Sequence, residues 1–450
     1  MPLKISRILH AGYVFEFEKT QIVFDPIFEN PFSKNCYAYP NVQFDIEKIK
    51  STRFSAIFIS HFHDDHCSLE SLNLLDKSIP IYIYCLYKEL FSMIKELGFA
   101  NVYPLKIGES VTIGKIEITP LRALDADVDS IFHIKVAGIN ILNVVDSWID
   151  SETMDLLSQT SPWDMVLWPF QTMREIEVLS PLRAHAATRE LPEEWLEQLN
   201  ILKPRFIVPS SCQFVQEDWS WYNQAFFPIS YAIFKKQIES ALPDTHVTRM
   251  NPSASFILDK STIQKAESLS WIKPIGQQDL DYQYDSNLKP PSTAETSKRF
   301  LALDVKQTER VFSYCRLGLL EKYKLIAQDF DPYFEKSKLW RLSIYDHTGK
   351  AEHFFYKLKG KKIELTNDTG GQLSWTTEIP ISKLYGALEY GESLTSLYIR
   401  INDMVFNPEI EKKIASVDIV EDPLIRCLFN DAFGAYQKAQ LVQIKEKNNN

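Results

Sequence analysis

The stretch Ser60-His61-Phe62-His63-Asp64-Asp65-His66 decides the fold of this chain. The apolar run 54–59 before it predicts a buried strand, and residues 67–75 after it predict a helix that begins near Ser68. A turn between a strand and a helix directs neighbouring side chains toward one point. Imidazole together with carboxylate is the usual ligand set for zinc or non-haem iron. The stretch therefore predicts a metal site.

Composition limits the classes of protein that fit. The chain has 450 residues, a formal net charge of −10 and no basic stripe, which argues against a nucleic-acid partner. Its six cysteines are scattered without framework spacing, which favours reduced thiols and a cytoplasmic location. We expect no signal peptide and no transmembrane segment, because no apolar stretch has the required length.

Two further polar positions stand at the ends of predicted strands. Runs of apolar residues over 2–25 predict a β-meander that is interrupted at His10-Ala11-Gly12 and ends at Asp25-Pro26. Residues 130–136 and 139–145 predict a hairpin that turns at Ala137-Gly138, and its second strand ends at Asp146. Strands that alternate with helices around these meanders predict an α/β sandwich with the sheets inside and the helices outside.

The window from His61 to His66 resembles the His-x-His-x-Asp-His motif of the metallo-β-lactamase-fold superfamily. The start of the chain resembles the branch that contains L-ascorbate-6-phosphate lactonase, N-acyl-phosphatidylethanolamine phospholipase D and the metal domain of CMP-sialic acid hydroxylase. This resemblance implies a four-layer αββα sandwich. It also implies one metal on His61 and His63, a second on Asp65 and His66, Asp146 bridging both, and His10 near the metals as a substrate-binding residue.

The sequence departs from the family pattern at two expected histidines. In the loop before residue 130, Asp125 lies nearest the position of the family's third site-one ligand. After the strand at 205–208, Ser211 or Cys212 stands where the family has a site-two histidine. A thiolate is a good ligand and a hydroxyl a poor one. Two metals with altered ligands, one metal, or an inactive site all remain open.

The predicted activity is metal-dependent hydrolysis of an ester, lactone, amide or phosphodiester by a metal-activated hydroxide. Asp65 is the predicted catalytic residue, because it can carry a proton to the leaving group. We expect one or two divalent ions, zinc first, with iron or manganese favoured if Asp125 is a ligand. The alternatives are a di-iron, non-haem oxidoreductase on the same fold and a metal-binding protein with a degenerate second site.

The remaining sequence predicts three segments and a small-molecule substrate. A catalytic domain is expected over 1–265, a connecting arm over 266–298 and an α+β accessory domain over 299–450. The accessory domain is expected to shape the substrate site, bind an apolar or lipid-like ligand, or support a homo-oligomer. An anionic substrate group is expected to meet cationic side chains after the strand at 164–170, with the candidates Arg174, Arg183 and His185.

Overall fold

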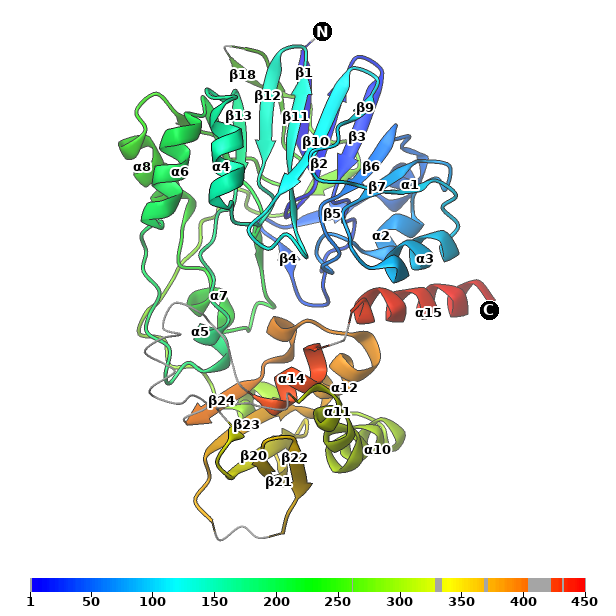
Figure 1. Ribbon diagram of the computed structural model, residues 1–450, viewed down its shortest axis with the longest axis vertical. Helices are drawn as coiled ribbons and strands as arrows, with labels where there is room; N and C mark the ends of the chain where they lie inside the picture. The colour runs from blue at the N-terminus through cyan, green and yellow to red at the C-terminus, as the bar shows by residue number, and fades with distance from the viewer. Residues whose placement is uncertain are drawn as a thin grey trace.

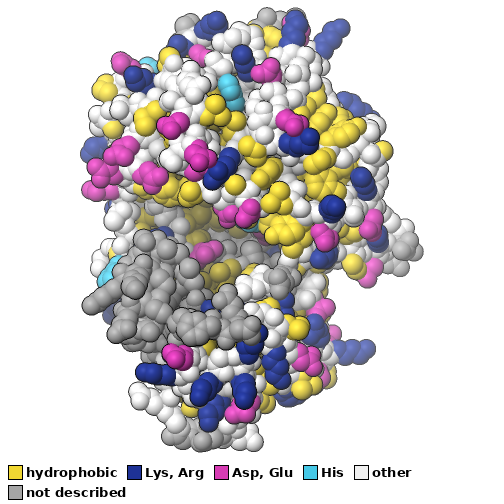
Figure 2. All heavy atoms as spheres, viewed as in Figure 1, with side chains coloured by type: hydrophobic (Ala, Val, Ile, Leu, Met, Phe, Trp, Pro, Cys, Tyr) yellow, Lys and Arg dark blue, Asp and Glu magenta, His cyan; other side chains and the backbone are white. Residues whose placement is uncertain are grey.

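The chain folds into a sandwich of two sheets with a second, smaller half beneath it (Figure 1). We describe it from a computed structural model, which covers residues 2–260, 262–327, 334–367, 371–403, 422–430 and 433–449. Between the two halves the surface narrows and is hollowed (Figure 2).

The first sheet carries the strands that flank the metal motif. Its order is β18 (Ile263–Ala266), β17 (Ser255–Leu258), β1 (Leu3–Arg7), β2 (Tyr13–Phe17), β3 (Thr20–Phe24), β6 (Ala56–Ile59), β7 (Ile81–Ile83) and β8 (Val102–Pro104). The second sheet has the order β16 (His246–Val247), β14 (Phe206–Pro209), β13 (Met165–Trp168), β12 (Ile139–Asn143), β11 (Ser130–Val136), β10 (Ile116–Arg122) and β9 (Val111–Ile113).

The two sheets pack through apolar side chains that alternate along their strands. Phe24 on β3 meets Phe132 on β11 edge to face, with ring centroids 5.1 Å apart. Helices cover the outer faces: α1 (Ile46–Ser51), α2 (Leu69–Asn73) and α3 (Lys88–Glu96) on one side, and α4 (Ser151–Ser158), α6 (Glu193–Leu202) and α8 (Tyr231–Ala241) on the other (Figure 1). The predicted four-layer αββα class is confirmed.

Local sequence signals explain the elements next to the motif. Ser68 is the N-cap of α2, and its side chain accepts a hydrogen bond from the backbone N–H of Ser71, as the predicted helix start requires. The hairpin of β11 and β12 turns at Ala137 and Gly138, which have φ values of 52° and 77°. Residues 147–157 predict a helix directly after Asp146, but the helix begins later, at Ser151, because Asp150 caps it.

The predicted connecting arm is packed against the sandwich over much of its length. Within it, β19 (Ile272–Pro274) pairs with β5 (Val42–Phe44), and Tyr282 is 5% exposed. A second small pairing joins β4 (Tyr37–Ala38) to β15 (Phe214–Val215). The arm ends in α9 (Thr293–Ser297). The domain boundaries at 265 and 298 stay a prediction.

The second half is built on a five-stranded sheet. Its order is β22 (Lys362–Leu365), β21 (Ala351–Lys359), β20 (Lys338–Tyr345), β23 (Trp375–Pro380) and β24 (Arg400–Asp403). Its helices are α10 (Val305–Ser313), α11 (Leu319–Ile326), α12 (Ile381–Tyr390) and α14 (Pro423–Phe429), with a π-helical turn at Tyr314–Gly318. Two short helices of the first half, α5 (Ile176–Leu179) and α7 (Tyr222–Ala225), lie toward this sheet (Figure 1).

Two predictions for this half need correction. Residues 396–401 predict a strand from their sequence, but the strand begins at Arg400, because residues Leu394–Leu397 form a 3-10 turn. Residues 424–444, which follow Pro423, predict one helix, but the structure has two, α14 and α15 (Ala435–Asn449). Helix α15 returns to lie beside α2 and α3 of the sandwich (Figure 1). Within the described residues, no helix is both long and apolar enough to cross a membrane.

Candidate metal centre

The candidate ligands stand on loops that leave one edge of the sandwich. The turn after β6 carries the His61–His66 motif, the end of β12 leads to Asp146, and the turn between β1 and β2 carries His10. The backbone is strained here: His10, Asp25 and Val145 have φ values of 48°, 40° and 61°. A positive φ is unfavourable for a β-branched residue such as Val145, and such strain concentrates at functional sites.

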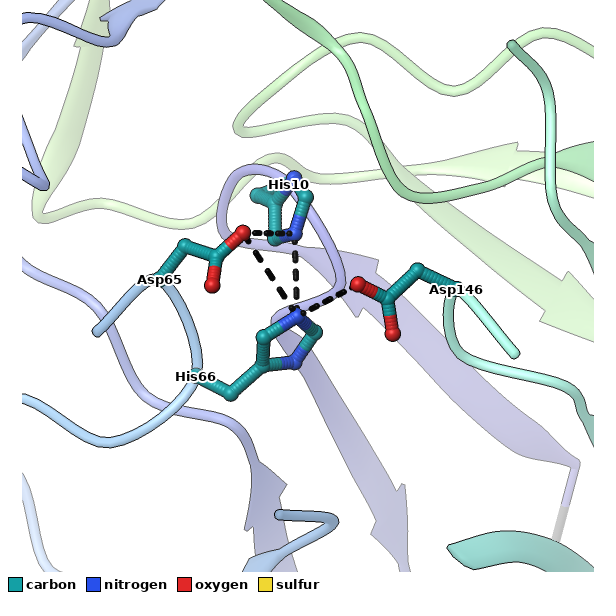
Figure 3. Close-up of side chains that lie close together, drawn as sticks. All are labelled: His10, Asp65, His66 and Asp146. Carbon is teal, nitrogen blue, oxygen red and sulfur yellow. Dashed lines mark hydrogen bonds and ion pairs between the residues drawn. The ribbon is translucent and has the colours of Figure 1, made fainter. Parts of the chain in front are cut away.

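The inner cluster consists of His10, Asp65, His66 and Asp146 (Figure 3). Nε2 of His66 lies 3.1 Å from Nε2 of His10 and 3.0 Å from Oδ2 of Asp146. Oδ2 of Asp65 lies 3.1 Å from Nε2 of His10 and 3.8 Å from Nε2 of His66. Donor atoms around a tetrahedral zinc ion are about 3.3 Å apart, so these separations suit one cation.

The outer cluster consists of His61, His63 and Asp129. Nε2 of His61 lies 3.0 Å from Nδ1 of His63 and 3.8 Å from Oδ1 of Asp129. It is also 4.0 Å from Oδ1 of Asp146, which places the Asp146 carboxylate between the two clusters. His61 is buried, whereas His63 is exposed.

Two carboxylate oxygens of the centre lack a hydrogen-bond partner among the described residues. They are Oδ1 of Asp129 and Oδ1 of Asp146, and both are buried. An unpaired buried carboxylate oxygen is unfavourable, because it has lost its water and gained nothing in return. A cation between these oxygens and Nε2 of His61 would satisfy both of them, so the residues fit a metal.

A second layer of hydrogen bonds orients His66. Its Nδ1 lies 3.0 Å from Oδ2 of Asp25, and Asp25 also accepts hydrogen bonds from the backbone N–H and the hydroxyl of Ser60. This carboxylate–imidazole arrangement is the usual support of a metal-binding histidine. Gly12 is needed nearby, because a Cβ atom at this position would lie 2.8 Å from the carbonyl oxygen of Asp25.

His10 is oriented by the backbone of Cys212. The Cys212 N–H donates to Nδ1 of His10 at 3.0 Å, from a residue with a φ of 50°. Because Nδ1 accepts this bond, the proton of a neutral His10 ring is assigned to Nε2, which faces Asp65. The Cys212 thiol is absent from both clusters, and burial raises its pKa, which disfavours the thiolate.

Comparison with known proteins agrees with this architecture. Residues 4–211 match the family model described as a beta-lactamase superfamily domain. This part of the chain is a metallo-β-lactamase-fold domain. The predicted superfamily is therefore confirmed, and the remaining question is which ligands and which substrate this metallo-β-lactamase-fold domain uses.

Relatives of this metallo-β-lactamase-fold domain differ in their described activities. Cytidine monophosphate-N-acetylneuraminic acid hydroxylases of Xenopus laevis and Mus musculus are 26% identical over 153 residues, which is 32% of this chain and 26% of the relative. The match thus spans about a quarter of these curated relatives. Similar solved structures include Igni18, a metallo hydrolase from Ignicoccus hospitalis (18% identity, TM-score 0.40, 58% of this chain, 99% of that one). Another is CmlA, a diiron beta-hydroxylase from Streptomyces venezuelae (15% identity, TM-score 0.40, 57% of this chain, 54% of that one).

The structure brings most of the predicted ligands of the metallo-β-lactamase-fold domain together, with one exchange. His61, His63, Asp65, His66 and Asp146 all lie in the two clusters. The exposed Asp125 is in neither, whereas Asp129, four residues later, lies in the outer cluster. Asp125 instead begins a tight turn, because its carbonyl accepts the N–H groups of Val128 and Asp129. His10 takes a place in the inner cluster that the expected substrate-binding role did not include.

The charged groups of the centre perturb each other's pKa values. Burial lowers the pKa of His61 and the neighbouring His66 lowers it further, which keeps the His61 ring neutral. Burial opposes a charge on His66 too, but Asp146 and Asp65 outweigh burial and raise the His66 pKa well above its usual value. Burial and the Asp146 carboxylate raise the pKa of Asp129 to about 6. Protons thus compete with a metal in both clusters.

The cationic residues expected to bind a substrate anion lie outside both clusters. The Arg174 guanidinium forms an ion pair with the Glu177 carboxylate at 2.8 Å and donates a hydrogen bond to the His185 carbonyl at 3.0 Å. The His185 side chain is exposed beside α5, and the Arg183 N–H donates to the Ser180 carbonyl at 2.9 Å, which closes a turn that Ser180 begins. Their role in substrate binding stays a prediction.

The C-terminal helix α15 holds the metal turn, which no local sequence signal predicts. The Gln437 amide donates to the carbonyl oxygens of Phe62 and Cys67, at 2.8 and 2.9 Å. Gln440 accepts the N–H of Leu69 and donates to the Ser68 hydroxyl. Both glutamines are almost fully buried, at 2% and 1% exposed. Residues about 370 positions away therefore support the loop that carries His61 and His63.

Proposed function

We propose that this chain is a metal-dependent hydrolase that cleaves an ester, lactone, amide or phosphodiester bond of a small molecule. The observation that carries the proposal is a pair of buried oxygens without a hydrogen-bond partner among the described residues, Oδ1 of Asp129 and Oδ1 of Asp146, which lie 3.8 and 4.0 Å from Nε2 of His61. Two adjacent clusters that share the Asp146 carboxylate suit a two-metal centre, and zinc is the metal we expect first.

The metal ions and the residues around such a centre would have different roles. Bound divalent ions would lower the pKa of water and polarise the substrate oxygen. Burial alone would raise the pKa of Asp65, but His66 and His10 outweigh burial and hold it well below its usual value, so Asp65 is ionised. An ionised Asp65 accepts a proton from water and transfers it to the leaving group. Oδ2 of Asp65 lies 3.1 Å from Nε2 of His10, so both atoms face the position that a metal would take.

Elemental analysis combined with a substrate panel tests the proposal. We expect two zinc ions per chain, hydrolysis of 4-nitrophenyl butyrate, a γ-lactone or bis(4-nitrophenyl) phosphate, loss of activity with chelator, and recovery with zinc. The double variant His61→Ala/His63→Ala should lose outer-site metal and turnover, and Asp125→Asn is the matched control. Full turnover in the double variant, or a chain that binds no metal, would contradict the hydrolase.

The second candidate function is that of a di-iron oxidoreductase. It is supported by the donor set, in which three carboxylates stand beside four imidazoles, because carboxylate-rich sites favour iron over zinc. The curated relatives are themselves named hydroxylases. Two irons per chain with reductant-dependent oxygen consumption, and no hydrolysis of the panel, would favour this function.

A further inference from the structure

A cavity of about 700 Å³ lies between the metal turn and the second half of the molecule. The first half contributes Phe62, His63 and Tyr87 to its lining, and the C-terminal part contributes Leu394, Phe429 and Phe433. A cavity of this size lies within the range of sites for small-molecule ligands.

One wall of the cavity is aromatic. The rings of Tyr87 and Phe433 stack with centroids 4.1 Å apart, and Phe62 packs against Phe433 at 4.7 Å. Tyr87 nevertheless remains 44% exposed, although it is a large ring. Exposed aromatic surface at a concave site favours a ring or an acyl chain as the ligand, because such a group removes the surface from water.

Another part of the cavity wall is fixed by a close backbone approach. Gly391 ends α12 with a φ of 61°, and a Cβ atom on it would lie 2.4 Å from the backbone nitrogen of Tyr436. The end of α12 and the start of α15 therefore touch through their backbones. The wall they form is part of the packed structure, so the cavity does not depend on a ligand to shape it.

The charge of the lining disfavours a polyanion. Asp64, Glu89 and Glu392 contribute carboxyl groups, whereas Lys438 is the one lysine or arginine among the described lining residues. Lys438 donates to the Phe433 carbonyl, and Glu392 pairs at 3.1 Å with Lys383, which lies outside the lining. With Glu392 paired to Lys383, the Asp64 and Glu89 carboxyl groups face the single ammonium of Lys438, so the described lining has no excess of positive charge that would hold a phosphate or several carboxylates.

His63 connects the cavity to the metal centre, because it lines the cavity and its Nδ1 lies 3.0 Å from Nε2 of His61 in the outer cluster. We propose that the cavity binds the non-reacting part of the substrate, an aromatic or acyl group that is neutral or cationic rather than anionic. This inference rests on the proposed hydrolase function only in calling the ligand a substrate. The ligand preference of the cavity is a separate property.

Three probes that differ only in their end group test the preference. Metal-free full-length protein is titrated with 4-phenylbutan-1-ol, 4-phenylbutylamine and 4-phenylbutanoate, and binding is followed by saturation-transfer NMR and calorimetry. Metal-free protein is used because a carboxylate would otherwise bind the metal directly. We expect the alcohol and the amine to bind at least about tenfold more tightly than the carboxylate.

Variants then place the bound probe. The substitutions Phe433→Ala and Tyr87→Ala should each weaken binding of the alcohol about five- to tenfold. Tyr87 is the more exposed of the two residues. Tyr103→Ala is the matched control, because this tyrosine is 45% exposed on β8 and is outside the cavity lining. In protein loaded with Mn²⁺, the phenyl protons of the probe should broaden strongly, because the cavity borders the outer cluster.

The outcomes separate the two ideas. The cavity proposal is overturned by equal or tighter binding of the carboxylate, by no binding of any probe, by unchanged affinity in both aromatic variants, or by no broadening although Mn²⁺ is bound. Failure of the protein to bind any metal would contradict the hydrolase function, and the ligand of the cavity could then not be called a substrate. The three metal-free titrations would still decide the ligand preference.

Discussion

The inner and outer clusters of the metal centre meet at Asp146, which belongs to the inner cluster and lies 4.0 Å from Nε2 of His61, but they differ in their support. In the inner cluster, His66 is fully buried and its second nitrogen is held by Asp25. In the outer cluster, His61 is buried and contacts the Ser60 hydroxyl, whereas His63 is exposed and borders the large cavity. We infer that the inner cluster is preorganised for a tightly held ion and that the outer cluster is the side open to substrate.

Removing one imidazole from each cluster should have unequal effects. His66→Ala should abolish inner-site metal and reduce hydrolysis by more than the roughly 100-fold that loss of an outer-shell partner costs. His63→Ala should lose the outer ion while the inner ion remains. Metal stoichiometry after dialysis and kcat/KM check both variants. Loss of both ions in His63→Ala, with retention of one in His66→Ala, would reverse the comparison.

The exchange of Asp125 for Asp129 gives a sharper test of the outer cluster. Asp129→Asn keeps the shape but removes the charge, so outer-site affinity should fall at least about tenfold. Asp125→Asn should leave it unchanged, because Asp125 is exposed and lies in neither cluster. Competition with a chromophoric chelator measures both affinities. An equal loss of metal affinity in the two variants would show that both substitutions disturb the loop as a whole. Asp129 could then not be assigned as the ligand.

Proton release should also distinguish the clusters. At pH 7.5 a His66 with a raised pKa is protonated in metal-free protein, so inner-site binding in His63→Ala should release about one proton. Asp129, with a pKa of about 6, is already ionised and His61 is neutral, so binding of the outer ion to protein that already holds the inner ion should release almost none. Calorimetry in buffers of different ionisation enthalpy counts these protons. Below pH 6 outer-site affinity should fall, because protons then occupy Asp129.

The sequence could predict those parts of the site that are local. The spacing of His61, His63, Asp65 and His66 defines its own turn. The family resemblance indicates Asp146 from its place after a predicted strand, although that strand ends at Asn143 rather than at residue 145. The choice between Asp125 and Asp129 could not be made, because the loop 123–129 has no periodic pattern and its register depends on a backbone turn. Equally, His10 joins the inner cluster only through the pairing of distant strands.

The smallest effect we expect concerns the support of the metal turn by α15. Gln437→Ala would leave the Phe62 and Cys67 carbonyls unpaired, at a cost of about 1–3 kcal/mol in the free energy of unfolding. Gln440→Ala is the matched control, because it removes hydrogen bonds of similar burial at the start of α2 instead. Both variants should lower the melting temperature to a similar extent.

Metal affinity separates a positioning role of Gln437 from simple stabilisation. Gln437→Ala should weaken the outer ion severalfold, because the Phe62 carbonyl that it holds lies between His61 and His63, whereas Gln440→Ala should not. Lys445→Ala, which breaks an ion pair to Glu96 that is half exposed on both sides, should change neither quantity measurably. If the two glutamine variants weaken the metal equally, α15 stabilises the fold without positioning the ligands. The outer cluster would then owe its geometry to the sandwich alone.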